Sequence, residues 1–129
     1  MIKLKKLLVL FSHKLTAEQV KDASDNLNIE EIIYLPEELQ KIWSNVNPYK
    51  DCKDSLNLIF EFVKKSLQKD DYALIQGEWG YVYDSINFCK TMKIIPIYAT
   101  TERVVRETPL SDGTIEKISI FKHVKFKQY

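Results

Sequence analysis

Two of the chain's three glycines lie in one five-residue segment, Gln76-Gly77-Glu78-Trp79-Gly80, directly after the apolar run Tyr72–Ile75. A strand that ends in such a Gly-x-x-Gly turn and then opens a helix leaves backbone N–H groups uncovered, and these groups favour an anion such as phosphate. The alternative is a tight strand-to-helix connection in which glycine supplies a positive φ. The segment therefore predicts either a phosphate cradle or a purely conformational turn.

Both arginines of the chain, Arg103 and Arg106, lie within four residues of each other after a predicted strand, whereas the seventeen lysines are spread along the sequence. The planar guanidinium binds phosphate through two parallel hydrogen bonds, which an ammonium group cannot do. With the hydroxyls of Thr100 and Thr101 beside it, Arg103 is a candidate phosphate clamp. A surface ion pair with a neighbouring glutamate is the structural alternative.

Ser12 and His13 follow the first predicted strand, at a position that suits ligand contacts. An imidazole can give or take a proton near neutral pH, so His13 is a candidate for proton transfer. The alternative is that His13 caps the helix that begins near Thr16.

Three further features carry two interpretations each. Glu78 is suited to bind a ribose hydroxyl or a base amine or to act as a general base, and equally to complement the macrodipole of its own helix. Trp79 and Tyr81 offer faces on which a base could stack, or else belong to the core. The tail Phe121–Lys127 alternates apolar and basic residues, among them Lys122, which fits a basic rim beside an anionic ligand or an edge strand protected by lysine.

Strand and helix patterns alternate along most of the chain. Extended segments are predicted at Leu4–Phe11, Glu31–Leu35, Tyr72–Ile75 and Ile94–Tyr98, and helices after Thr16, from Pro36, over Lys53–Lys69 and over Tyr81–Met92. Thr16 and Gln19 form a capping box at the start of the first helix. Val104–Thr108 and Ile115–Phe126, joined by the turn Ser111-Asp112-Gly113, predict a closing antiparallel hairpin.

This order of elements is typical of an α/β fold, a Rossmann-like, mostly parallel sheet flanked by helices, with a C-terminal antiparallel hairpin. In such sheets ligands bind outside the carboxyl ends of the strands, where the strand order reverses. Polar segments follow three of the predicted strands, namely Ser12-His13-Lys14, Gln76–Gly80 and Ala99–Arg103. We therefore expect His13, the glycine bend and Arg103 to meet around one crevice.

Length and composition fit one domain over residues 1–129. The formal net charge of +1 argues against the broad basic surface that a DNA-binding protein needs. Cys52 and Cys89 form no Cys-x-x-Cys motif and the two histidines are far apart, so neither a disulfide framework nor a metal site is predicted. Reduced cysteines indicate a cytoplasmic location. The apolar run Leu7–Phe11 is too short to cross a membrane, so no membrane partner is expected.

The chain resembles the small stand-alone Csx proteins of type III CRISPR systems over nearly its whole length. The segments that carry the resemblance are Phe11–Thr16, Tyr34–Gln40, Gln76–Gly80, Tyr98–Arg103 and Phe121–Phe126. The resemblance implies a domain related to the CRISPR-associated Rossmann fold (CARF), acting as a homodimer that binds cyclic tetra-adenylate. Several such families are ring nucleases, which open this second messenger and switch off antiviral signalling.

The resemblance leaves two activities open, cleavage of the ring or its sequestration by a non-catalytic sponge or sensor. A flavodoxin-like nucleotide-binding protein is a further alternative, although a fuller glycine-rich fingerprint is absent from the sequence.

Ring cleavage needs no cofactor and no metal, because the ribose 2′-OH can attack the neighbouring phosphorus and leave a 2′,3′-cyclic phosphate. In this hypothesis His13 is the acid or base, and Arg103 stabilises the phosphoryl charge together with backbone N–H groups at Gly77–Gly80. The remaining candidate ligand-binding residues are Ser12, Gln76, Glu78, Trp79, Thr100, Thr101 and Lys122.

Overall fold

A computed structural model describes residues 3–129 as a five-stranded sheet flanked by four helices. The elements are β1 (Lys5–Leu10), α1 (Ala17–Leu27), β2 (Ile29–Tyr34), α2 (Glu37–Ser44), α3 (Lys53–Ser66), β3 (Tyr72–Ile75), α4 (Trp79–Thr91), β4 (Ile95–Pro109) and β5 (Ile115–Gln128). The strand order is β2-β1-β3-β4-β5, with β1 to β4 parallel and β5 antiparallel to β4. The predicted mixed α/β fold with a mostly parallel sheet and a C-terminal hairpin is confirmed.

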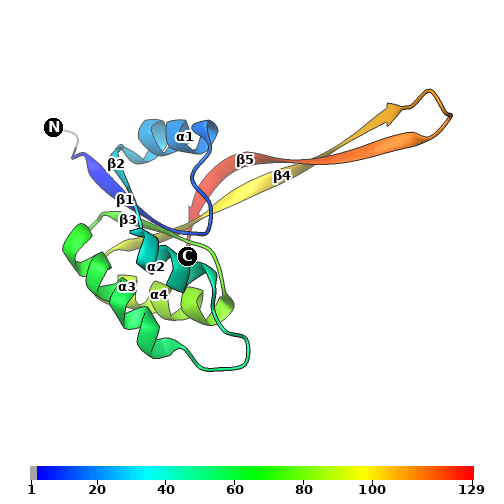
Figure 1. Cartoon of the computed structure of the whole chain (residues 1–129). Helices are drawn as coiled ribbons and strands as arrows, with labels where there is room; N and C mark the ends of the chain where they lie inside the picture. The colour runs from blue at the N-terminus through cyan, green and yellow to red at the C-terminus, as the bar shows by residue number, and fades with distance from the viewer. Residues whose placement is uncertain (1–2) are drawn as a thin grey trace.

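The sheet is covered on both faces, by α1 on one side and by α2, α3 and α4 on the other (Figure 1). Leu7 and Val9 of β1 pack with Ala23 of α1, whereas Leu8 and Leu10 pack into the cluster beneath the other three helices. All four of these β1 side chains are fully buried. A strand that is buried on both faces reads as a continuous apolar run, which is the pattern that identified β1 in the sequence.

The strand order reverses at β1, which lies between β2 and β3. The loops that follow β1 and β3 therefore leave the same edge of the sheet as neighbours. The backbone N–H of Gln76 donates to the carbonyl of Leu10 (3.0 Å), and the side-chain amide of Gln40 donates to the carbonyl of Phe11 (2.9 Å). These bonds hold the two loops and α2 together at the edge where a ligand is expected.

Helix α1 begins with the predicted capping box. The N–H of Gln19 donates to Thr16 Oγ1 (3.2 Å), and the N–H of Thr16 donates to Gln19 Oε1 (2.9 Å). Because Thr16 is the N-cap, the capping alternative for His13 is wrong. The other helices begin and end within a turn of their predicted bounds.

The sequence predicts two separate extended segments, Ile94–Tyr98 and Val104–Thr108, but the structure joins them into one strand. Strand β4 continues from Ile95 to Pro109, and it pairs with β5 from Ile97↔Gln128 to Pro109↔Ile115 with one irregularity at Thr100/Thr101. The segment between the two prolines of β4 contains no glycine and several β-branched residues, so nothing interrupts the pairing.

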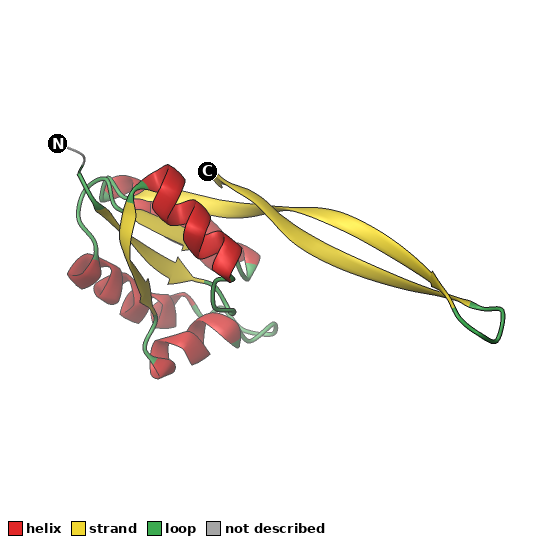
Figure 2. Cartoon of the chain, turned by 90° about the horizontal axis from the view of Figure 1, so that it is seen from above, coloured by secondary structure: helices red, strands yellow, loops and turns green. Residues whose placement is uncertain are grey.

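The continuous pairing produces a hairpin far longer than predicted, and it projects away from the helices (Figures 1 and 2). We call the segment from Thr101 to His123 the arm. Its turn lies where the sequence placed it, with Gly113 in the left-handed region (φ 87°) and its N–H donating to the carbonyl of Leu110 (3.1 Å).

Candidate functional site

A cavity of about 930 Å³, the arm-root cavity, lies between the loop after β1, the first turn of α1 and the near part of the arm. The loop and α1 contribute Phe11, His13, Lys14, Thr16, Ala17, Glu18 and Gln19, and the arm contributes Thr101, Val104, Arg106, Ile120, Phe121, Lys122 and His123. Residues from the two ends of the sequence therefore form one concave surface.

The chemistry of the arm-root cavity suits a phosphorylated ligand with aromatic bases. Lys14, Arg106 and Lys122 bring positive charge to a chain whose net charge is only +1, and Glu18 is the one carboxylate among the lining residues. Guanidinium and ammonium groups bind phosphate oxygens. Phe11 and Phe121 add apolar surface against which a base can lie.

His13 lines the arm-root cavity and is exposed to solvent. Its ring meets the ring of Phe11 edge to face, with centroids 5.1 Å apart and planes at 77°. The imidazole is thus positioned by an aromatic contact while it remains open to solvent. This placement is compatible with proton transfer to a bound ligand.

A largely buried pair joins the arm to α1 at the edge of this cavity. His123 Nε2 donates to Asp22 Oδ2 (2.7 Å), and the two side chains are 6% and 17% exposed. Partial burial opposes ionisation of Asp22, but hydrogen bonds from Asn26 and His123 outweigh it and lower the pKa of the carboxyl. The pair fixes the arm as one wall of the cavity. Sequence reasoning placed His123 only in the basic tail, because no local pattern links residues this far apart.

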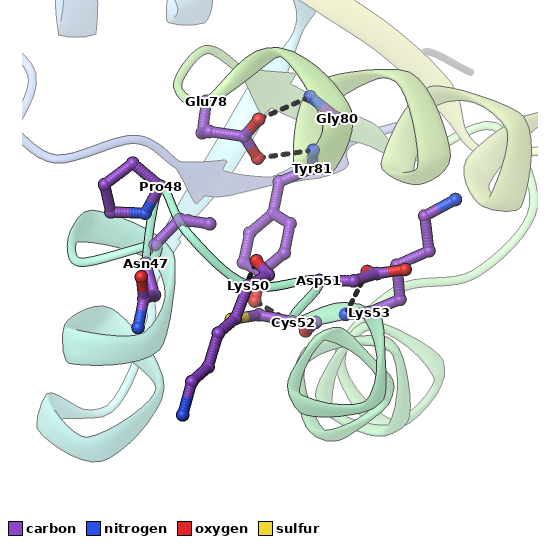
Figure 3. Close-up of a pocket in the computed structure, with 10 residues that line it drawn as sticks. Asn47, Pro48, Lys50, Asp51, Cys52, Lys53, Glu78, Gly80 and Tyr81 are labelled. Carbon is purple, nitrogen blue, oxygen red and sulfur yellow. Dashed lines mark hydrogen bonds between the residues drawn. The ribbon is translucent and has the colours of Figure 1, made fainter.

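In the glycine segment after β3, a side chain occupies two of the backbone N–H groups that the predicted phosphate cradle would use. Figure 3 shows the carboxylate of Glu78 accepting hydrogen bonds from the backbone N–H groups of Gly80 (2.9 Å) and Tyr81 (3.2 Å). Glu78 is the N-cap of α4, so its own negative charge occupies the helix N-terminus. The helix-stabilising interpretation of Glu78 is the one that the structure shows.

Gly77 is explained by a close approach to Trp43. A Cβ at position 77 would lie 2.8 Å from Trp43 Nε1, which donates to the carbonyl of Gln76 (3.1 Å). Gly77 does not have a positive φ, so the alternative in which glycine supplies a positive φ is wrong at this position. The side chain of Gln76 accepts from the N–H of Ala99 (3.0 Å) and ties the end of β3 to β4.

The two candidate stacking residues lie in different environments. Tyr81 is 3% exposed, and its hydroxyl donates to the carbonyl of Cys52 (2.8 Å) across a cavity of about 450 Å³ drawn in Figure 3. Tyr81 is therefore a core residue. Trp79 is 90% exposed and lies with Tyr83 and Tyr129 around a cavity of about 380 Å³. Tyr83 was missed, although its spacing of four residues from Trp79 on a helix places both on one face.

The predicted phosphate clamp lies on the arm and outside the arm-root cavity. Arg103 donates from Nε (3.2 Å) and Nη2 (2.9 Å) to Ser119 Oγ, which differs from the ion pair considered as its alternative. Arg106 lines the cavity instead. Thr100 Oγ1 donates to the carbonyl of Lys125 (2.8 Å) within the hairpin.

The expected single crevice is therefore divided. Of the predicted site residues, the arm-root cavity holds His13, Thr101 and Lys122. The cavity of about 380 Å³ beside Trp79 is also lined by Gln76 and Gly77. The cavity of Figure 3 is lined by Glu78 and Gly80, and a fourth cavity of about 440 Å³ is lined by Ser12. Ser12 Oγ accepts from Ser44 Oγ (3.0 Å) beside α2. The prediction that His13, the glycine bend and Arg103 surround one linkage is wrong, because β4 carries Arg103 out along the arm.

Within residues 3–129, no three side chains of the types that bind metals come together. No helix in this part of the chain has the length and apolar character needed to span a membrane.

Comparison with known proteins gives a family without assigning an activity. The model of the family described as "Uncharacterized protein MJ1673 family" matches residues 5–127. The chain is 46% identical over 125 residues to "Uncharacterized protein MJ1673" of Methanocaldococcus jannaschii, and the match covers 96% of each protein. No solved structure matches the chain. The match over nearly the full length of both sequences shows that the chain belongs to the MJ1673 family.

Proposed function

We propose that this protein is a type III CRISPR ring nuclease that binds cyclic tetra-adenylate at the arm-root cavity and opens it. The observation that carries the proposal is the convergence of His13, Arg106 and Lys122 on one cavity of about 930 Å³. A proton-transfer group beside two phosphate-binding cations is what cleavage of an RNA linkage requires. The sequence resemblance to the small Csx proteins supports the choice of substrate.

The proposed reaction uses a nucleophile that belongs to the substrate. His13 accepts the proton of a ribose 2′-OH, or donates a proton to the departing 5′ oxygen. The 2′ oxygen forms a bond to phosphorus while the bond from phosphorus to the 5′ oxygen breaks, which leaves a 2′,3′-cyclic phosphate and a 5′-hydroxyl. Arg106 and Lys122 balance the charge that develops on the phosphoryl oxygens. In this proposal Arg106, in place of Arg103, is the arginine that stabilises the phosphoryl charge.

The test is incubation of purified protein with cyclic tetra-adenylate in the presence of a chelator, followed by chromatography of the products. We expect linear fragments that end in 2′,3′-cyclic phosphate. His13→Ala should reduce the cleavage rate by at least about 100-fold while the ring still binds, since general acid or base catalysis contributes that much. Arg106→Ala should weaken binding as well as cleavage.

Lys90→Ala is the matched control for the loss of a positive charge, because Lys90 is exposed on α4 and lines none of the described cavities. Its cleavage rate should equal that of the unmodified protein. A ring that neither binds nor changes after long incubation with excess protein would contradict the proposal.

Sequestration of the ring without cleavage is the second candidate function. It is favoured by the separation of Arg103 from His13, since the catalytic pair expected from the sequence is not assembled within one chain. A sponge would return the ring intact after denaturation. A ring of four identical nucleotides has a two-fold axis that a homodimer can share, so we expect one ring per two chains.

A further inference from the structure

The arm is a two-stranded ribbon that exposes apolar side chains. Every residue from 101 to 119 is exposed, and Val105, Ile115 and Phe121 reach 50%, 59% and 68%. Figures 1 and 2 agree that the far part of the arm extends away from all four helices. An isolated two-stranded hairpin is marginally stable in water, and three or more strands are needed for independent stability. The arm therefore has the properties of an element that is completed by another chain.

The outer edge of β4 is the unpaired edge most open to a further strand. β4 pairs with β3 only as far as Ile97, and beyond this point its pairing within residues 3–129 is with β5 alone. Such an edge presents free N–H and C=O groups that can pair with another strand. The edge of β5 carries Lys122, Lys125 and Lys127, whereas β4 contains no lysine, and prolines occur only near its two ends. Lysine and proline are the usual protection against edge pairing, so β4 is the less protected edge.

The charges of this edge suit antiparallel pairing with a second copy. Residues 101 to 108 are Thr-Glu-Arg-Val-Val-Arg-Glu-Thr, with one arginine and one glutamate on each side of the two valines. Two copies of a strand related by a two-fold axis run antiparallel, and each contact then occurs twice. With Val105 opposite Val105 of the partner subunit, Arg103 faces the partner's Glu107 and Glu107 faces the partner's Arg103. Opposite charges in direct cross-strand positions stabilise a sheet.

We propose that residues 101–108 of β4 pair antiparallel with the same segment of a second copy of this chain, so that the sheet runs through both subunits of a homodimer. The arm's charge favours a second copy over a nucleic acid. Its four acidic residues (Glu102, Glu107, Asp112, Glu116) equal its four basic residues (Arg103, Arg106, Lys117, Lys122). In the Val105-centred register Arg106 lies opposite the partner's Val104, which leaves its guanidinium for the arm-root cavity. This inference goes beyond the proposed function, because it needs no nucleotide.

Charge reversal tests the pairing in nucleotide-free buffer. Two double variants are compared, Glu102→Arg/Glu107→Arg and Arg103→Glu/Arg106→Glu. In each of them residue 103 and the partner's residue 107 carry the same charge. Each variant alone should therefore be monomeric by light scattering. An equimolar mixture should form a heterodimer, because the two edges are then complementary. Wild type should be dimeric. A monomeric wild type, or variants that remain dimeric by themselves, would overturn the proposal. Arm-driven binding to RNA in place of self-association would also overturn it.

Disulfide cross-linking tests the register. In a Cys52→Ser background the remaining Cys89 is buried, which raises the pKa of its thiol to about 12 and keeps it unreactive. Val105→Cys should form a cross-linked dimer on mild oxidation, because directly opposite Cα atoms in antiparallel strands lie within the range of a disulfide. Val104→Cys tests the neighbouring register and Ser119→Cys tests the edge of β5. Cross-linking at either of these positions but not at 105 would overturn the assignment.

The two proposals fail separately. A protein that is dimeric through the arm but leaves cyclic tetra-adenylate unbound refutes the proposed function alone. A monomer that cleaves the ring refutes the arm pairing alone.

Discussion

At the scale of single residues, the indole of Trp43 lies against the backbone of the loop after β3. Its side chain is 1% exposed, and its Nε1 donates to the carbonyl of Gln76 (3.1 Å). The space for this contact exists only because residue 77 has no side chain. Gly77 looks like part of a ligand motif, but it makes room for the side chain of Trp43. Trp43 is distant in the sequence, 33 residues before its hydrogen-bond partner Gln76.

Substitution of this glycine should therefore cost stability. Gly77→Ala places a methyl group 2.8 Å from Trp43 Nε1, and we expect a loss of about 1–3 kcal/mol in the free energy of unfolding. Urea denaturation followed by tryptophan fluorescence measures the loss. Gly80→Ala is the matched control, since its Cβ would meet only Glu78 at 3.4 Å and alanine favours the helix. Equal stability of the two variants would contradict this account of Gly77.

At the scale of elements, the pair of Asp22 and His123 sets how the arm joins the sheet. It connects α1 to β5 across 101 residues of sequence, next to the core residue Phe126. His123 also packs against Phe126, with ring centroids 4.8 Å apart. The wall of the arm-root cavity therefore depends on an interaction between two elements.

Loss of the Asp22 charge should weaken this junction. Asp22→Asn removes a charged hydrogen-bond acceptor of a buried histidine, and we expect a loss of about 1–2 kcal/mol at neutral pH. The pKa of Asp22 is lowered in the folded protein. Its ionised carboxylate therefore contributes to the free energy of unfolding above the ordinary aspartate pKa of about 3.9. This contribution is lost as the pH falls through the lower pKa of the folded state. The difference between wild type and variant, measured by urea denaturation, should shrink below about pH 4.

Asp25→Asn provides the comparison on the same helix. Asp25 forms an exposed ion pair with Lys21 (2.7 Å), and such pairs contribute less than about 1 kcal/mol. Two results would contradict the role of Asp22 at the junction of the arm and α1. One is a loss in the free energy of unfolding that is as large for Asp25→Asn as for Asp22→Asn. The other is a loss for Asp22→Asn that does not change with pH.

Local signals explain which elements were predictable. The Thr16 and Gln19 capping box lies within four residues, and the apolar run of β1 reports burial on both faces, so both were predicted correctly. The continuation of β4 from Tyr98 to Val104 was missed because the polar residues Thr100–Arg103 resemble a loop when the pairing strand is unknown. The contacts of Gly77 with Trp43 and of Asp22 with His123 join residues far apart in the sequence, so no local pattern predicts them. The first explains the glycine without a ligand, and the second fixes a wall of the candidate site.

At the scale of the whole molecule, the core and the arm are built from different residues. Among the buried apolar residues, Phe126 is the one that follows Ile97 in the sequence. The layers of helices and sheet are thus complete without the part of the hairpin beyond Arg103 and Phe121. A hairpin of this kind contributes to association more than to the stability of one chain.

A shortened arm separates these contributions. Replacing Val104–Ile120 by Asn-Gly closes the hairpin between the paired residues Arg103 and Phe121 with a two-residue turn. At high dilution, where any dimer has dissociated, its melting temperature should lie within about 4 °C of wild type, because no buried core residue is removed. At high concentration wild type should melt at a higher temperature while the shortened chain stays unchanged, since association stabilises only the protein that can dimerise. Circular dichroism melts over a concentration series measure both effects. A shortened chain that fails to fold at any concentration would mean that the arm belongs to the core of a single subunit.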